Sequence, residues 1–210
     1  EKDAVVLDIG GTTTDLTIVR SGRAMLAADG VNVGGWRTGT RAIGVRTIGL
    51  GGDSHIAFDG KGLLTLGPDR ALPLCMLTRM YPETTKRLRQ IETENRWQTY
   101  SLAEFYYPVH PDLDAPADLC EGDRRIYDLV RAEPRTKQDL ADLTGQKVYF
   151  LDLDTLLRRR LIGVSALTPT DLWHVSGEFT AFDADAARMG THILANRLEL
   201  TGKQLHTRVL

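Results

Sequence analysis

The chain has 210 residues, of which 42% are hydrophobic and 26% charged, and its formal net charge is −2 at pH 7. This balance is ordinary for a globular protein and gives no overall attraction to nucleic acid or anionic membranes. No apolar run approaches the roughly 20 residues that a membrane helix requires. The two cysteines, Cys75 and Cys120, lack metal-ligand spacing. We therefore expect a cytoplasmic protein without a membrane span or a disulfide framework.

The N-terminal third of the chain is rich in strand patterns and glycine. Apolar runs over 4–9, 16–19 and 23–27 are joined by short turns, which predicts an antiparallel meander. The glycine-rich stretch over 30–44 is expected to be mostly loop. Two apolar segments, joined by an Asp-Gly-Lys-Gly turn at 59–62, predict a hairpin.

Beyond Pro73 the apolar residues take helical spacing. Helices are expected, in chain order, over 83–96, 123–133, 137–143, 153–161 and 183–200. Thr136 is expected to be an N-cap and Gly145 a helix stop. Strands are expected over the aromatic segment 97–107 and over 162–165.

A turn rich in glycine and threonine, Asp8-Ile-Gly-Gly-Thr-Thr-Thr-Asp15, follows the first predicted strand. Its glycines allow the backbone to approach a ligand closely, and consecutive amides can form an anion nest. Threonine hydroxyls add further donors. We therefore expect a nucleotide phosphate to be bound here by Gly10, Gly11, Thr12, Thr13 and Thr14. The alternative is an ordinary Asp-Gly-Gly hairpin in which the threonines only favour strand.

Two carboxylates flank this turn, Asp8 before it and Asp15 after it. Carboxylates would repel a bare phosphate, whereas Mg²⁺ commonly takes one or two carboxylates and keeps several waters. Asp8 and Asp15 are therefore the predicted metal-binding and catalytic residues.

A second glycine turn covers residues 49–54. We expect it to complete the nucleotide or substrate wall through Gly51, Gly52, Asp53 and Ser54. The alternative is a simple turn into the hairpin. Among the histidines, His55 beside this turn is the only candidate for a functional role, and His174 is expected to pack or cap.

These segments together resemble the hydantoinase/oxoprolinase family, of the hydantoinase A type, within the actin-like and sugar-kinase-like ATPases. The resemblance rests on residues 8–15, on the Arg-Thr-Ile-Gly-Leu-Gly-Gly-Asp-Ser run at 46–54, on Leu66-Gly67-Pro68, and on Leu167-Thr168-Pro169-Thr170-Asp171. The sequence departs from the family at Asp53, where relatives commonly have glycine, and in the segment that follows Pro68.

The resemblance implies an α/β fold with a ribonuclease-H-like lobe of an actin-type ATPase, built from residues 1–117 and 163–210, with a helical, winged-helix-like insertion at 118–162. It also implies ATP and Mg²⁺ as cofactors and a hydrolase that uses ATP to open a cyclic amide such as hydantoin or 5-oxoproline, or a related carboxylase. The chain begins without Met and matches only the second of two lobes. We therefore expect a piece of a longer protein whose first lobe, or a partner subunit, completes the site.

Two other functions share these features. A small-molecule kinase would use the same phosphate loop and pass the phosphoryl group to a stable acceptor. A regulator would use the ATPase fold as a switch and dock DNA or protein through the helical block, with Arg158, Arg159 and Arg160 as its basic face. Aspartates surround these arginines, so a structural insertion is favoured and nucleic-acid binding is not expected.

Overall fold

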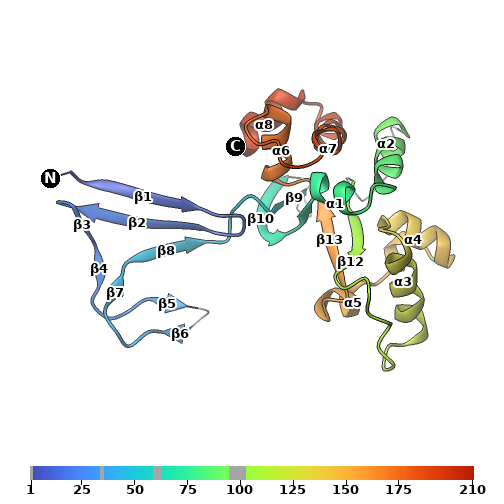
Figure 1. The fold of residues 1–210 in the computed structure, drawn as a ribbon, viewed down its shortest axis with the longest axis horizontal. Helices are drawn as coiled ribbons and strands as arrows, with labels where there is room; N and C mark the ends of the chain where they lie inside the picture. The colour runs from blue at the N-terminus through green and yellow to red at the C-terminus, as the bar shows by residue number, and fades with distance from the viewer. Residues whose placement is uncertain (1, 34–35, 59–62, 95–102) are drawn as a thin grey trace.

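The chain forms an extended antiparallel sheet followed by a helical body, as a computed structural model shows (Figure 1). The structure describes residues 2–33, 36–58, 63–94 and 103–210. The architecture is mixed α/β, which confirms the predicted class at that level; the ribonuclease-H-like lobe and the domain boundaries stay predictions. No helix within these described ranges is long and apolar enough to cross a membrane.

The strands are β1 (Ala4–Ile9), β2 (Thr14–Arg20), β3 (Arg23–Ala24), β4 (Leu26–Ala27), β5 (Asn32–Val33), β6 (Trp36–Arg37), β7 (Ala42–Ile43), β8 (Val45–Ile48), β9 (Ser54–Phe58), β10 (Leu64–Arg70), β11 (Leu72–Pro73), β12 (Phe105–Pro108) and β13 (Ile162–Ala166). The helices are α1 (Leu74–Met80), α2 (Thr84–Glu94), α3 (Glu121–Ala132), α4 (Lys137–Thr144), the 3₁₀ turn η1 (Val148–Phe150), α5 (Asp154–Arg158), α6 (Pro169–Ser176), α7 (Ala184–Arg197) and α8 (Gly202–Val209).

The N-terminal sheet has β2 at its centre. β1 pairs antiparallel with one edge of β2, and both β3 and β8 pair with the other edge. The predicted meander is confirmed for its first two strands, whereas the third ends at Ala24 and the chain continues into a separate pair, β4 with β7. The stretch over 30–44, expected as loop, contains short two-residue strands.

Both faces of β1 are exposed. Val5, Leu7 and Ile9 alternate onto one face with 61%, 55% and 61% of their surface exposed, and Val6 on the other face is 47% exposed. A strand that is apolar on both faces is typical of a sheet covered on both sides. The N-terminal sheet therefore leaves apolar surface uncovered within the described chain.

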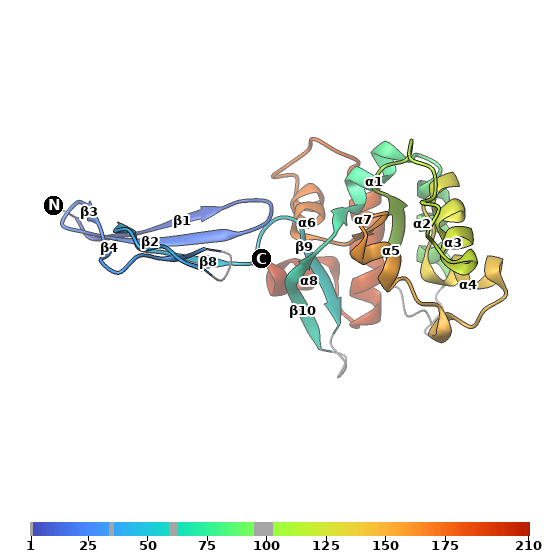
Figure 2. The ribbon, with the colours of Figure 1, turned by 90° about the horizontal axis from the view of Figure 1, so that it is seen from below.

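The principal core lies in the helical body, where α1, α6 and α7 pack beside the β9–β10 hairpin (Figure 2). The hairpin is antiparallel, as predicted; its turn at 59–62 lies outside the described residues. A three-stranded sheet, β11–β13–β12, joins β11 to β13 in parallel and β12 to β13 in antiparallel fashion. The fully buried side chains include Leu74, Leu77, Leu88, Leu172 and Leu205.

A second core holds the helical block together. Ile126, Tyr127, Leu140 and Leu156 from α3, α4 and α5 are buried against each other and against Tyr106 of β12. The predicted capping of α4 is confirmed: Thr136 accepts a hydrogen bond from the Asp139 amide, and Gly145 ends the helix in the left-handed conformation at φ 71°. The observed α5 is shorter than the predicted helix over 153–161.

Candidate functional site

The two glycine turns lie directly against each other. The Gly52 amide donates to the Gly10 carbonyl at 3.2 Å, and the Asp53 amide donates to the Gly11 carbonyl at 2.6 Å. A side chain at Gly51 would place its Cβ 2.5 Å from the Gly10 carbonyl oxygen. Glycine at this position is therefore what lets the second turn reach the first, and the two predicted loops form one surface.

Some of the predicted phosphate donors of the first turn already form hydrogen bonds within the protein. The Gly10 amide donates to the Thr13 carbonyl at 2.9 Å, and the Thr14 hydroxyl donates to the Leu50 carbonyl at 2.8 Å. Within the described part of the chain, no acceptor takes the amides of Gly11, Thr12 or Thr13. These three amides are therefore the donors that the turn offers to an anion, and Thr14 secures the turn to the second loop.

Asp8 and Asp15 face each other across the β1–β2 ladder, where they form a directly opposed pair. The next residue along this row is Thr47 of β8, whose hydroxyl donates to the Asp15 carboxylate. Opposed like charges destabilise a strand pair unless something compensates them. The chemistry of the pair would suit Mg²⁺, which commonly takes one or two carboxylates. No larger group of three or more potential ligands occurs among the described residues.

The second turn is closed by Ser54. Its hydroxyl oxygen accepts from the Gly51 amide at 2.9 Å, and the residue is only 2% exposed. Asp53 directs its carboxylate toward Gly11, where an added Cβ would lie 3.2 Å from Oδ2. Burial raises the pKa of Asp53, and the nearby Arg70 partly opposes the shift. Ser54 therefore shapes the loop, whereas the Asp53 side chain lies at its junction with the first turn.

Thr170, which was not among the predicted site residues, joins this surface from the start of α6. Its amide and its hydroxyl both donate to the Gly52 carbonyl, at 3.0 and 2.9 Å. Its signal in the sequence is the Thr-Pro-Thr-Asp segment at 168–171, which is part of the family resemblance. The start of α6 thus fixes the second glycine turn in place.

Asp171 anchors the start of α6 to the rest of the body. Its fully buried carboxylate accepts from the amide and hydroxyl of Thr168, at 2.9 and 3.0 Å, and from the amides of Leu74 and Cys75 at the start of α1, at 3.2 and 2.9 Å. One carboxylate therefore caps two helices, and its role is to hold the second glycine turn against a rigid support.

His174 and Cys75 approach each other but do not form a catalytic pair. The Phe182 amide donates to His174 Nε2 at 3.0 Å, so this nitrogen must be unprotonated, and Nδ1 donates to the Thr170 carbonyl at 2.7 Å. Both ring nitrogens are therefore engaged and the side chain is buried, which confirms its predicted packing role. Burial raises the pKa of the Cys75 thiol well above its usual range, so the thiol is not a nucleophile.

His55 points toward the body rather than the glycine turns. Its Nε2 lies 3.7 Å from the Glu104 carboxylate, which in turn accepts from the Tyr106 hydroxyl at 2.6 Å. This places the side chain at the contact between β9 and the segment leading into β12.

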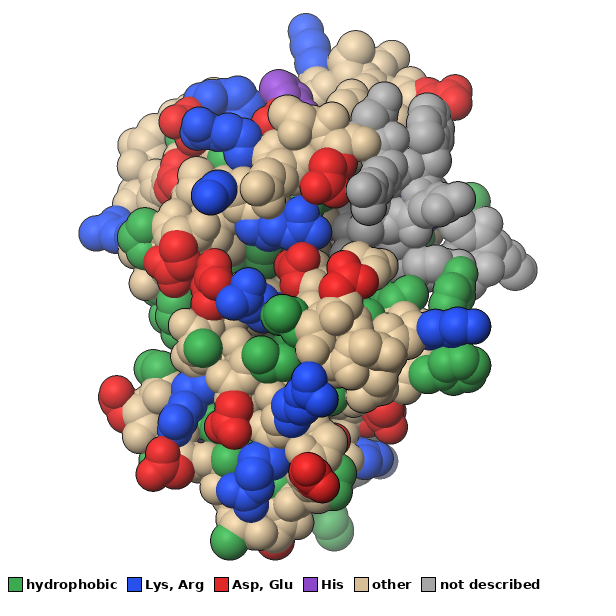
Figure 3. Space-filling view, turned by 90° about the vertical axis from the view of Figure 1, so that its right-hand side faces the viewer, with side chains coloured by type: hydrophobic (Ala, Val, Ile, Leu, Met, Phe, Trp, Pro, Cys, Tyr) green, Lys and Arg blue, Asp and Glu red, His purple; other side chains and the backbone are tan. Residues whose placement is uncertain are grey.

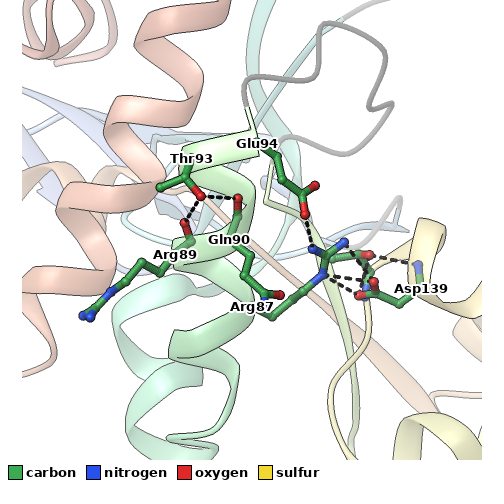
Figure 4. Close-up of polar contacts among 7 residues, drawn as sticks. Arg87, Arg89, Gln90, Thr93, Glu94 and Asp139 are labelled. Atoms are coloured by element: carbon green, nitrogen blue, oxygen red, sulfur yellow. Dashed lines mark hydrogen bonds and ion pairs between the residues drawn. The ribbon is translucent and has the colours of Figure 1, made fainter.

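The helical block is fixed to α2 by a bidentate ion pair. Arg87 Nε donates to both oxygens of Asp139, at 3.0 and 3.2 Å (Figure 4). Within the arginine run of the predicted basic face, Arg159 is itself paired with Asp118 at 3.0 Å. The side of the molecule that carries α2, α3 and α4 shows both signs of charge interspersed (Figure 3). Arg159 is thus engaged within the protein, and the charges on this side alternate in sign.

Comparison with known proteins places the glycine turns in a family context. The profile of the hydantoinase/oxoprolinase family matches residues 1–73. No functionally curated protein matches the chain at a significant level. A solved structure of acetone carboxylase, described as nucleotide-free and from work on ATP-dependent acetone carboxylation, is 19% identical with a TM-score of 0.32. The similarity covers 70% of this chain and 18% of that one, so this chain spans less than a fifth of its length.

Proposed function

We propose that the chain is one lobe of an ATP- and Mg²⁺-dependent hydrolase of cyclic amides, or of a related carboxylase, on the basis of the match of residues 1–73 to the hydantoinase/oxoprolinase family. Residues 1–117 and 163–210 would form the lobe and 118–162 its insertion. The observation that carries the proposal is the contact between the two glycine turns beside the opposed pair of Asp8 and Asp15.

The phosphate would lie on the first turn. The amides of Gly11, Thr12 and Thr13 are consecutive and have no internal acceptor within the described chain, and such amides can converge on an anion. The second turn supports this surface because the Gly52 and Asp53 amides donate hydrogen bonds to carbonyls of the first turn. Gly52 and Asp53 would therefore act by positioning the first turn rather than by donating to phosphate.

Asp8 and Asp15 would hold Mg²⁺ through water, since their carboxylates share one face of the sheet. When bound, the ion would neutralise phosphate charge and orient the phosphates for transfer to the substrate oxygen. The contribution of the chain itself is to fix the two carboxylates and the free amides relative to each other.

A second lobe is the proposed partner. The exposed apolar side chains of Val5, Leu7 and Ile9 lie on the strand that leads directly into the phosphate turn. A second lobe that covered these side chains would remove their apolar surface from water. Each fully buried side chain of this kind contributes about 2 kcal/mol to the free energy of association. We expect this lobe, on the same polypeptide or on a partner subunit, to close over the nucleotide.

The experiment is calorimetric titration of ATP into the chain, with and without Mg²⁺, alone and with the proposed second lobe. Binding that requires Mg²⁺ and tightens with the second lobe would support the proposal, and phosphate release with hydantoin or 5-oxoproline would then distinguish hydrolase substrates. Absence of ATP binding in both preparations would overturn it.

A further inference from the structure

An open surface pocket of about 300 Å³ lies beside the second glycine turn and is lined by Thr170, Trp173, Glu178 and Phe179. It is close to the phosphate turn. A Cβ at Gly52 would lie 2.8 Å from the Thr170 hydroxyl oxygen, 3.5 Å from the Trp173 ring and 3.8 Å from Gly11 Cα. One residue therefore separates the wall of the pocket from the turn that offers free amides.

One aromatic wall of the pocket, the Phe179 ring, packs against its neighbours. The Phe179 ring meets His174 edge to face, with centroids 4.8 Å apart and planes at 76°, and the Phe179 amide donates to the Trp173 carbonyl at 3.3 Å. Since His174 is itself fixed at both ring nitrogens, the Phe179 ring has a rigid support. The Phe179 side of the pocket is thus supported by a fixed residue.

The polar groups of the pocket are acceptors. The Thr170 hydroxyl gives its proton to the Gly52 carbonyl, so its oxygen can act toward a further group only as an acceptor. Glu178 is exposed, and no hydrogen bond or ion pair engages its carboxylate within the described residues. An ionised carboxylate accepts from N–H and O–H groups and repels anions. The lining therefore favours a flat ligand that carries N–H or O–H donors, and it disfavours phosphate.

We propose that this pocket, the Trp173 pocket, binds a planar heterocycle carrying N–H groups, with Trp173 and Phe179 against the ring and Glu178 accepting from an N–H. The inference rests on the proposed function, because two components of that reaction share this chemistry: the nucleobase of ATP and a cyclic amide. A volume of about 300 Å³ is at the lower end of small-molecule sites, which suits a single ring system.

The test uses ligands that lack phosphate, so that the Trp173 pocket is probed separately from the phosphate turn. Adenosine and hydantoin are each titrated calorimetrically into the unaltered chain and into Trp173→Ala, Glu178→Gln and Trp36→Ala. Trp36 lies on β6 and is 82% exposed, which makes it the matched control. Glu178 is exposed, so its variant should fold even where Trp173→Ala does not.

We expect one of the two ligands to bind and to lose roughly tenfold in affinity in Trp173→Ala, the loss typical when an aromatic stacking contact is removed. Glu178→Gln should weaken the same ligand, and Trp36→Ala should not. Adenosine binding would identify the nucleobase as the occupant, and hydantoin binding the substrate. Binding of neither, or affinities unchanged in Trp173→Ala and Glu178→Gln, would overturn the proposal.

Tripolyphosphate with Mg²⁺ serves as the separate probe of the phosphate turn. Asp8→Asn should weaken tripolyphosphate binding and leave the heterocycle affinity unchanged. If the heterocycle bound but tripolyphosphate did not, the proposed function would be contradicted and the assignment of the Trp173 pocket would stand. If tripolyphosphate bound but neither heterocycle did, only the assignment of the pocket would be contradicted.

Discussion

Asp8 of β1 lies directly opposite Asp15 of β2, so two carboxylates stand side by side on one face of an antiparallel pair. Side chains in such positions have Cβ atoms only about 5 Å apart, and like charges there oppose pairing. Thr47 satisfies Asp15 with a hydroxyl donor but supplies no positive charge. The arrangement therefore costs stability in the absence of a cation, which gives the metal assignment a consequence that can be measured.

Asp8→Asn should weaken Mg-ATP binding and, without Mg²⁺, leave the protein equally or slightly more stable, by about 0.5 kcal/mol, because the repulsion is removed. Calorimetry with and without Mg²⁺ measures the first effect, and thermal unfolding measures the second. Asp69→Asn, at an exposed position of β10, is the control for the charge change. An unaltered Mg²⁺ requirement in Asp8→Asn would contradict the metal assignment.

Gly51→Ala should separate the two glycine turns. The added Cβ would meet backbone atoms, 2.5 Å from the Gly10 oxygen and 2.7 Å from the Gly11 carbonyl carbon, which cannot rotate away. We expect a loss of about 1–3 kcal/mol in unfolding free energy, typical of overpacking, together with weaker nucleotide binding. Gly39→Ala, where an added Cβ has no neighbour within 4 Å, is the control in urea denaturation. Equal stability of the two variants would show that the turns do not need this close approach.

Local sequence was sufficient for the first turn and for α4, because their determinants are neighbours in the chain. The β1–β2 pairing follows from two apolar runs around a glycine turn, and the cap of α4 is formed by Thr136 and Asp139, three residues apart. The capping box at Thr201 and Gln204, which starts α8, is an equally local signal.

The start of α1 and the support of the second turn depend on contacts that local patterns do not contain. α1 follows Pro73 without a side-chain cap of its own, and its first amides donate to Asp171, 97 and 96 residues away along the chain. Likewise, Thr170 reaches Gly52 across 118 residues. Such contacts are set by the packing of α6 between the glycine turn and α1, and only the structure reveals them.

Asp53→Asn should stabilise the protein in a pH-dependent manner. Burial raises the pKa of Asp53 in the folded state, so folding favours the neutral carboxyl. The favourable contribution is complete below the unfolded pKa, near 3.9, and is lost as the pH rises through the higher folded value. Asparagine removes this loss, so we expect a small rise in melting temperature at pH 7 that disappears near pH 3.

Thermal unfolding across this pH range, with Asp69→Asn as the exposed control, measures the effect. A difference between Asp53→Asn and the unaltered protein that stayed constant with pH would mean that ionisation of Asp53 does not affect stability.

The Arg87–Asp139 pair should determine how firmly the helical block is held to α2. Arg87 forms a fork with Asp139, with Nη2 also 2.9 Å from Oδ1, and contacts Glu94 at 3.3 Å. Arg87→Lys keeps the charge but loses the planar fork, so we expect a loss of about 1 kcal/mol. Asp139→Ala should cost more, about 2–3 kcal/mol, because Asp139 also accepts from the amide and hydroxyl of Thr136 at the start of α4.

Urea denaturation of both single variants and of the double variant gives the coupling energy, which we expect to be about 1 kcal/mol. Arg89→Lys is the control, because Arg89 is exposed on the same helix and points away from Asp139 in Figure 4. Coupling near zero would mean that the block is held to α2 by its apolar contacts alone. If Arg87→Lys weakened the attachment of the helical block but left nucleotide binding unchanged, then the glycine turns would function independently of the position of the block.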